Sequence, residues 1–441
     1  MRQGWKHRLV RSRLWLQPGL GVKRWLALLL VGVALLGLAL ALALVNAYRT
    51  APPTDFMRIL TLQFLPRLLR AGLVGGLGLA AASLALYRLN QSLLAPFVMG
   101  SGEPVVEALH RHRQRQKGPH VVAIGGGTGL SNLLRGLKAY TANITAIVTV
   151  ADDGGSSGRL RRDFGVLPPG DIRNCLAALA NDEALMTQLF QYRFAEGAGL
   201  NGHSFGNLFI SAMAGVTGSF ERAVLESGHV LAVQGQIIPS TLEDVTLCAD
   251  LREGLGADPG GLRRVEGESV IPTSGQPIER VFLRPDRVHA YPAAVRAILD
   301  ADLIVAGPGS LFTSILPNLL VEGIPQAIRS SRGVKVFVCN VANQAGETDG
   351  YRVDDYVSAL RRHVGCDLFA IVVADSGKSD YPVAVRVGPN HARDYQLVVR
   401  DLVDRKRPTQ HDPETLASSL MGILEQYRVA RHGSAGISLR R

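Results

Sequence analysis

The sequence predicts an α/β fold with a mostly parallel sheet and helices on both faces, preceded by a hairpin of two transmembrane helices. Short apolar runs each lead directly into a loop rich in glycine or polar residues, and a helical pattern follows the first of these loops. This order is typical of βα units. Two long uncharged apolar runs lie upstream. The predicted strands are 120–124, 144–150, 302–306, 335–339 and 369–374.

Charge is distributed unevenly along the 441 residues, which carry a net charge of +11. Residues 1–117 contain 16 Lys/Arg and 3 Asp/Glu, whereas the other 324 residues contain 32 and 34. The excess positive charge therefore lies beside the long apolar runs, where it fits membrane topology and anionic lipid. The large domain shows no excess of basic residues, so we expect no nucleic-acid partner. A hydrophobic content of 47% excludes a disordered protein.

Two segments, 25–45 and 71–87, have the composition of transmembrane helices. A cleaved signal peptide is the alternative for the first, but its apolar region would usually span only about 7–15 residues. Seven Lys/Arg precede the first segment and basic residues follow the second, which predicts a multi-pass protein of the inner (plasma) membrane with both termini and the main domain in the cytoplasm. Residues 89–117 are then a basic juxtamembrane linker, lying on the lipid surface or simply solvated.

The first predicted strand, 120–124, leads into a cluster of glycines. Glycines allow a sharp turn and leave backbone N–H groups facing the start of the next helix, which is a natural phosphate site. The dinucleotide pattern GxGxxG is broken by Leu130, so NAD is not favoured as a cofactor. A structural turn is the alternative. The candidate phosphate-binding residues are Gly125, Gly126, Gly127, Thr128 and Gly129.

The second predicted strand, 144–150, ends in a loop with Asp152, Asp153 and Ser156. Acidic residues at the carboxyl end of a strand lie where an open α/β sheet binds its ligand. They are suited to ribose hydroxyls or to a divalent cation such as Mg²⁺. An Asx-type turn with glycine is the alternative interpretation.

Several long motifs follow one another along residues 119 to about 425. They are GGGTGL, VADDGGSSGRLR, PPGDIRN, GHSFGN, AYPAAVRAILDADLIVAGPGSLFTSILPNLL and VKVFVCNVANQAGETDGY. In this order they resemble the gluconeogenesis factor (YvcK-type) family, which is related to the 2-phospho-L-lactate transferases. The resemblance implies a Rossmann-like fold and binding of a nucleotide-sugar of the UDP-N-acetylglucosamine kind. It also implies a role linking carbon metabolism to cell-wall synthesis and cell shape, without an established reaction. The chain departs from the usual pattern at Phe312 and at Asp355-Tyr356.

Two of these motifs hold further candidate ligand residues. Asp171 is expected to cap a helix or to point into a cleft, and Asn174 shares its helix face. Arg173 is suited to a phosphate. His203 and Asn207 are candidates mainly because the resemblance implies a ligand there.

A second anion site is predicted where strand 302–306 runs into the sequence GPGS and a helix. Gly307 and Gly309 allow the turn, and Ser310 and Thr313 place hydroxyls in the first helical turn. Simple capping of the helix by Ser310 is the alternative. The following strand, 335–339, leads to polar side chains that can bond a uracil edge or sugar hydroxyls. They are Asn340, Asn343, Gln344, Glu347 and Thr348.

The remaining segments complete a domain plan. We expect a membrane region at 1–88, the linker at 89–117, a ligand-binding domain at 118–430 and a basic tail at 431–441. Within the domain, residues 228–288 predict a smaller β-rich subregion, with strands in HVLAVQGQIIPS, VTLCADL and ERVFLRP. Four separated cysteines indicate neither a zinc site nor a disulfide framework.

Three functional interpretations follow. The first is a non-catalytic, membrane-anchored regulator that binds a nucleotide-sugar, with cell-wall synthesis proteins as partners and a homo-oligomeric state. The second is a transferase in which Asp152 and Asp153 hold Mg²⁺ at a diphosphate. The third, a nicotinamide-dependent oxidoreductase, is disfavoured by the broken glycine pattern.

Overall fold

The computed structural model describes residues 114–437, except Asp182, Ala198, 253–260, 378–380 and 389–392, together with scattered positions between 33 and 83. The chain divides into two units, Met1–Arg113 and Gln114–Arg441. The predicted transmembrane segments, the linker and the end of the tail lie almost entirely outside the described residues. Within the described part, no single helix passes as a membrane span by length and apolar character. The pair Phe205–Thr217 and Phe220–Val230 passes jointly, with a bend of 117°.

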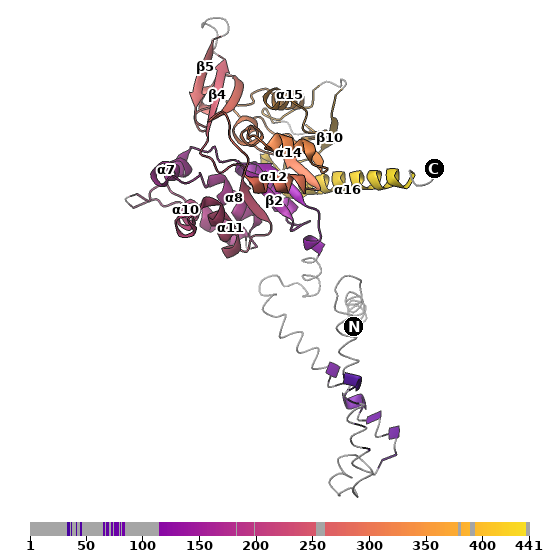
Figure 1. Ribbon diagram of the computed structural model, residues 1–441. Helices are drawn as coiled ribbons and strands as arrows, with labels where there is room; N and C mark the ends of the chain where they lie inside the picture. Colours follow the sequence, from indigo (N-terminus) through magenta and orange to yellow (C-terminus); the bar gives the residue numbers. More distant parts are fainter. Residues whose placement is uncertain are drawn as a thin grey trace. The chain divides into compact units, whose positions relative to one another are not determined.

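A seven-stranded sheet forms the centre of the second unit (Figure 1). Its order is β10-β9-β8-β7-β1-β2-β3, and every neighbouring pair is parallel. The predicted parallel sheet is thereby confirmed. The strands are β1 (Val121–Gly125), β2 (Ile144–Val148), β3 (Gln236–Pro239), β7 (Leu303–Ala306), β8 (Val334–Val338), β9 (Ile371–Asp375) and β10 (Gln396–Arg400).

Helices cover both faces of this sheet because its strands are apolar on both sides. In β1, Val121 and Ala123 pack into one apolar core, and Val122 and Ile124 pack into the other. The first core is completed by α6 (Gly127–Leu137), α8 (Gly170–Leu179), α9 (Glu183–Gln191), α10 (Phe205–Thr217), α11 (Phe220–Val230) and α16 (Pro413–Ile437). The second is completed by α12 (Pro292–Leu299), η3 (Leu311–Ile315), α13 (Leu316–Leu319), α14 (Ile324–Ser330) and α15 (Val353–Val364).

The strand order reverses between β1 and β7. From β1 the chain moves outward through β2 to β3, and from β7 it moves in the opposite direction through β8 and β9 to β10. In open α/β sheets the loops on either side of such a reversal separate and leave a crevice at the carboxyl ends of the strands. Here those loops are Gly126–Gly129 after β1 and Gly307–Ser310 after β7.

The predicted β-rich subregion is smaller than expected. It is an antiparallel sheet of β4 (Thr246–Arg252), β5 (Leu262–Glu266) and β6 (Ile278–Arg284), in the order β5-β4-β6, and it projects from the body in Figure 1. The segment 229–240, predicted as one of its strands, instead ends α11 and forms β3 of the main sheet. The reason is that Ile237 and Ile238 are buried and pair with β2.

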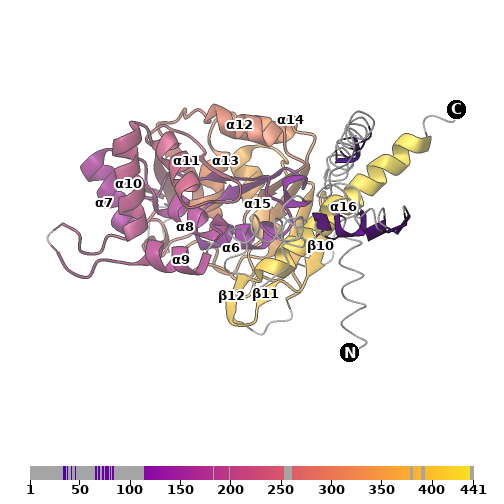
Figure 2. The same cartoon turned by 90° about the horizontal axis from the view of Figure 1, so that it is seen from below.

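The C-terminal part differs from the expected plan. A hairpin of β11 (Val403–Asp404) and β12 (Arg407–His411) precedes the 25-residue helix α16, and both are visible in Figure 2. The helix continues through Ile437, so the first part of the predicted tail is helical. Two short helical elements complete the unit, α7 (Gly155–Phe164) and η2 (Pro272–Ser274).

Candidate functional site

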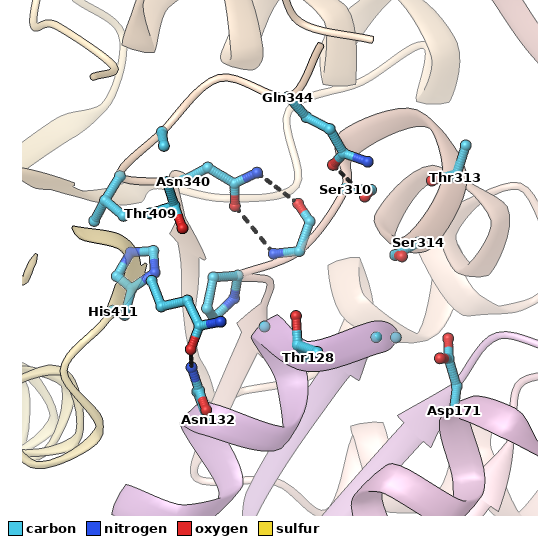
Figure 3. A pocket seen from close by; sticks show the side chains of 18 of the residues that line it. Thr128, Asn132, Asp171, Ser310, Thr313, Ser314, Asn340, Gln344, Thr409 and His411 are labelled. Atoms are coloured by element: carbon cyan, nitrogen blue, oxygen red, sulfur yellow. Dashed lines mark hydrogen bonds between the residues drawn. The ribbon is translucent and has the colours of Figure 1, made fainter. Parts of the chain in front are cut away.

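A polar cleft of about 480 Å³ lies at the carboxyl edge of the sheet, over the reversal between β1 and β7. Its walls come from four parts of the sequence that the fold brings together (Figure 3). They are the loop after β1, the loop after β7, the segment 340–344 after β8, and the end of β12. Asp152, Asp171 and Glu268 close one side. This volume is in the usual range for a small-molecule site, about 300–1,000 Å³.

The loop after β1 leaves the start of α6 open toward the cleft. The N-cap of α6 is Gly126, which provides no side-chain cap, and Gly127, Thr128 and Gly129 line the cleft. The first N–H groups of a helix have no partner within the helix and carry its positive end. The carboxylate of Asp171 accepts one of them, from Gly127. The rest of this turn is a suitable site for an anionic group.

Close packing explains the glycines of this loop. A methyl group on Gly129 would overlap the carbonyl group of Pro308 in the neighbouring loop, and one on Gly126 would overlap the carboxylate of Asp171. Gly127 has a φ of +63°, which favours glycine. The two loops are therefore in van der Waals contact at the strand reversal.

The loop after β7 is held by side chains of the same chain. The amide of Asn340 accepts from Gly309 N (3.0 Å) and donates to Gly309 O (2.9 Å), while the Ser310 hydroxyl donates to Gln344 (Figure 3). Glu347 is 5% exposed and accepts from Phe312 N (3.3 Å) and the Thr313 hydroxyl (2.9 Å). A protein carboxylate thus occupies the start of this helix, where we expected the anion of a ligand.

The acidic side of the cleft contains three interacting carboxyl groups. Burial, reinforced by Asp152, raises the pKa of Asp171 to about 6. Burial also raises the pKa of Asp152. Glu268 comes from the loop after β5; burial and then the charges of Asp152 and Asp171 raise its pKa to about 8. This loop is held by Asp153, whose carboxylate accepts from Ser269 N at 2.9 Å.

These acids do not match the geometry of a metal centre. Among the residues that the structure describes, no group of three His, Cys, Asp or Glu side chains is arranged to hold an ion. Asp152 instead accepts from Gly154 N at 2.9 Å, as in the Asx-type turn considered above. The residues present therefore do not fit a protein-held Mg²⁺ at Asp152 and Asp153.

A second polar cluster lies behind the cleft. The Ser156 hydroxyl is 3.0 Å from His203 Nδ1, and the amide of Asn207 donates to Ser156 (3.1 Å) and Ser157 (3.3 Å). Burial lowers the pKa of His203. These side chains are buried and join the start of α7 to the start of α10. None of them lines the cleft.

Comparison with known proteins identifies the family. The 2-phospho-L-lactate transferase CofD family matches residues 121–426. The gluconeogenesis factor of Bacillus subtilis is 44% identical over 70% of this chain and 99% of its own length. The chain belongs to this family. A crystal structure of a UPF0052 family member from Bacillus halodurans, 40% identical, covers 69% of this chain and 99% of its own, with a TM-score of 0.63.

Relatives in the family differ in how much of this chain they match. A Nostoc sp. protein is 44% identical over 97% of this chain, which includes most of the first 113 residues. The Bacillus subtilis gluconeogenesis factor matches 70% with almost its full length. The second unit thus corresponds to a complete protein in some family members, and the Bacillus halodurans crystal structure shows that such a unit folds without the first.

The structure brings twelve of the predicted ligand residues of this gluconeogenesis factor homologue to the cleft. They are Gly126, Gly127, Thr128, Gly129, Asp152, Asp171, Gly309, Ser310, Thr313, Asn340, Asn343 and Gln344. Asp171 was also expected to be an N-cap. That was wrong, because α8 begins at Gly170 after Pro169, and the Asp171 side chain turns to Gly127 instead of its own helix.

The other predicted residues lie outside the cleft, with identifiable partners in several cases. Asn174 accepts from Arg173 (3.0 Å), which also donates to Ser204 (2.7 Å). Thr348 accepts from Gln344 N (3.0 Å) and from the hydroxyl of Tyr356 (3.0 Å). The predicted residues that do not line the cleft are Gly125, Asp153, Ser156, Asn174, His203, Asn207, Gly307, Glu347 and Thr348.

The two departures from the family pattern also lie away from the cleft. Phe312 and Tyr356 are fully buried in the core that contains α15. Phe312 packs edge-on against Tyr351. Neither side chain lines the cleft, but the Tyr356 hydroxyl donates to Asn343 of the lining at 3.1 Å.

Several cleft residues were missed at the level of sequence. Asn132 lies one turn into α6 and donates to Gln410 of β12 at 3.1 Å. His411 Nε2 is 3.1 Å from Cys339 O, and burial lowers the pKa of His411 to about 4. The neutral ring must donate there, because a carbonyl only accepts. The remaining missed lining residues are Thr149, Glu268, Pro308, Ser314, Val341, Ala342 and Thr409.

Proposed function

We propose that the cleft binds a nucleotide-sugar of the UDP-N-acetylglucosamine type, with its diphosphate at the start of α6. The observation that carries the proposal is the uncapped first turn of α6, which faces the cleft at the strand reversal. Backbone N–H groups and the positive end of a helix stabilise phosphate oxygens there. Position, volume and polarity all suit this ligand class.

The rest of the lining supports an oriented ligand. Asn343, Gln344, Thr409 and Gln410 offer amides and hydroxyls, which both donate and accept hydrogen bonds. These groups suit the edge of a uracil ring and the hydroxyls of a sugar. Asp152 and Glu268 lie near Asp171, whose carboxylate accepts from Gly127 N, and negative charge on this side of the cleft favours hydroxyl donors over phosphate.

In this proposal the protein is a regulator that links carbon metabolism to cell-wall synthesis and cell shape. It acts from the inner membrane, anchored by helices at 25–45 and 71–87, with both termini in the cytoplasm. Cell-wall synthesis proteins and further copies of the chain are its partners. Recovery of the full-length protein in the membrane fraction after alkaline carbonate extraction supports the anchor; release into the supernatant refutes it.

Titration calorimetry of residues 114–441 with UDP-N-acetylglucosamine tests the binding proposal. We expect saturable binding that UDP competes for, and weaker binding of N-acetylglucosamine alone because the phosphate contacts are lost. Absence of heat with every UDP-sugar at millimolar concentration, for a protein with a cooperative melting transition, contradicts the proposal.

A transferase is the second candidate, favoured by the match to the CofD family and by the raised pKa of Asp171, which lets this group exchange a proton near neutral pH. It predicts turnover of a nucleotide-diphosphate-linked substrate with added Mg²⁺, and loss of turnover in Asp171→Asn. Ligand binding that is independent of metal and gives no product counts against it.

A further inference from the structure

The edge of the seven-stranded sheet opposite the cleft, which we call the amino edge, collects the segments that precede each strand. All seven strands are parallel, so their starts lie together. The second unit also begins here. The Asn143 amide donates to Gly118 O (2.8 Å) and the Thr141 hydroxyl to Pro119 O (2.9 Å), which fixes residues 114–120 beside the start of β2. The first described residues of the second unit therefore lie at this edge.

Exposed basic side chains are gathered at the amino edge. Lys117 precedes β1, and Arg296 lies in the last turn of α12 before β7. Arg329 lies in the last turn of α14, and Arg332 lies between α14 and β8. Helix dipoles favour cations in last helical turns, but Lys117 and Arg332 lie outside helices. Residues 118–441 as a whole carry 32 Lys/Arg and 34 Asp/Glu, a net charge of −2.

The opposite edge has the opposite charge. The cleft there contains Asp152, Asp171 and Glu268. Acidic side chains thus gather at the cleft, whereas the amino edge carries the bases named above together with Asp300 and Asp302. Such a distribution orients a protein at a charged surface.

Apolar side chains are exposed beside these bases. Tyr140 and Val429 line one groove together with Arg428 of α16, and they are 41% and 68% exposed. Arg428 pairs with Asp302 (3.0 Å) at the start of β7, which places this part of α16 at the amino edge. Leu299, 45% exposed, follows Arg296 in α12. Basic groups interspersed with tyrosine and aliphatic side chains are typical of surfaces that lie in the headgroup region of a membrane.

We propose that the amino edge of the second unit binds the surface of an anionic lipid bilayer. Lys117, Arg296, Arg329 and Arg332 contact lipid phosphates, and Tyr140 and Val429 enter the headgroup region. The cleft then faces away from the lipid, toward a soluble ligand. The proposal also fits the membrane anchor proposed above, because in the sequence residues 88–113 connect the predicted second span to Gln114. The charge and apolar arguments do not depend on that anchor.

Vesicle co-sedimentation of residues 114–441 tests this face without the predicted spans. We expect binding to phosphatidylglycerol vesicles at low salt, weaker binding in 0.5 M NaCl, and little binding to phosphatidylcholine alone. The triple variant Arg296→Glu, Arg329→Glu and Arg332→Glu is expected to bind at least about tenfold more weakly, since each basic residue near an anionic surface contributes measurably.

A matched control reverses three exposed arginines elsewhere, with Arg162→Glu, Arg222→Glu and Arg263→Glu in α7, α11 and β5. It changes the net charge equally and is expected to reduce binding less than threefold. No binding by the wild-type unit, equal binding to both lipids, or equal losses in the two triple variants would each overturn the proposal. Melting curves confirm that both variants fold. Calorimetry with UDP-sugars and carbonate extraction of the full chain are separate readouts, so their failure is distinguishable from failure here.

Discussion

Two glycine-containing loops meet at the strand reversal, and the helix start that follows each of them has a different partner. Both follow a buried parallel strand and both lead into a helical segment. After β1, the first turn of α6 has no side-chain cap and faces the cleft. After β7, the start of η3 is filled by the carboxylate of Glu347, and the loop is bonded to Asn340 and Gln344. Similar sequence patterns thus produce one open and one occupied helix start.

The difference shows which feature allows the N-terminal turn of a helix to bind an anion. Every helix begins with N–H groups that need acceptors, and a protein can supply the acceptor itself. Glu347 does so from a position 34 residues beyond Thr313 in the sequence, and burial keeps water from replacing it. The loop after β1 receives only the carboxylate of Asp171 at Gly127. An open first turn in a cleft is therefore the informative feature, and the glycines alone are not.

The largest effect on ligand affinity is expected from a substitution that disturbs the open loop. In Gly129→Ala the new methyl group would overlap the backbone of Pro308, so the two loops must separate. We expect UDP-sugar affinity to fall by about a hundredfold or more and unfolding free energy to fall by about 1–3 kcal/mol, as for other overpacked sites. Calorimetry and denaturant unfolding measure the two quantities.

Gly215→Ala in α10 is the matched control, because nothing lies within 4 Å of a methyl group there. It is expected to stabilise the unit by up to about 1 kcal/mol through helix propensity and to leave affinity unchanged. If Gly129→Ala binds ligand as tightly as Gly215→Ala, the open loop is not the phosphate site.

The filled loop predicts a smaller effect, mainly on stability. Glu347→Ala removes the acceptor of Phe312 N and of the Thr313 hydroxyl in a buried place, which costs about 1–3 kcal/mol for unsatisfied donors. We expect urea unfolding to show this loss. Glu226→Ala, at an exposed position of α11, serves as the control and should change stability by less than about 0.5 kcal/mol. Equal losses in the two variants would mean that Glu347 does not cap η3.

The fold was predictable from the sequence in its main features, because buried parallel strands are continuous apolar runs that end in glycine or polar loops. Five of the seven strands (β1, β2, β7, β8 and β9) follow from that pattern with ends within two residues of the observed ones, as does the opening βα unit. Segment 229–240 was misassigned since its alternating pattern suits a strand of either sheet. Only pairing with β2 distinguishes the two sheets.

The site was predictable where its residues follow strands directly, and not where distant segments return to it. Gly126–Gly129 and Asn340 were found because they follow β1 and β8. Glu268 and Gln410 come from a loop and a hairpin whose position depends on tertiary packing, and neither lies in a recognisable motif. Glu347 was predicted to bind the ligand. Its place in the sequence does not reveal that its carboxylate accepts from Phe312 N at the start of η3.

Acidic groups beside the open loop predict a pH effect of intermediate size. The pKa values of Asp171 (about 6) and Glu268 (about 8) are raised above those of the unfolded chain, near 4. Between about pH 4 and 8 the folded unit therefore binds more protons than the unfolded chain, and its free energy of unfolding should fall as pH rises through this range. Ionised Glu268 also repels phosphate, so UDP-sugar affinity should fall about two- to tenfold between pH 6.5 and 9.

Glu268→Gln separates this electrostatic effect from others. Without the titrating carboxyl group, both the stability loss and the affinity loss above pH 7 should be reduced. Glu279→Gln, at a partly exposed position of β6, should retain the wild-type profile. Thermal melting and calorimetry at five pH values follow the two quantities. Profiles that are unchanged in Glu268→Gln would remove this residue from the acidic side of the cleft.

The smallest effect concerns how the open loop is supported from outside. The helix start after the open loop has no side-chain cap, but α6 is linked to β12 by the hydrogen bond from Asn132 to Gln410 (3.1 Å). In the filled loop, by contrast, Asn340 bonds directly to the loop backbone at Gly309. Gln410→Ala removes one polar contact from the lining and the link between α6 and β12. We expect about a threefold loss of UDP-sugar affinity and a stability change below about 1 kcal/mol, since a single hydrogen bond contributes little net free energy.

Asn340→Ala should show the reverse, with a larger loss of stability than of affinity, because the bonds of Asn340 to Gly309 shape the filled loop. A double mutant that loses the sum of the two single effects is the expected result for supports that act on separate loops; strong non-additivity would show that the two loops behave as one element.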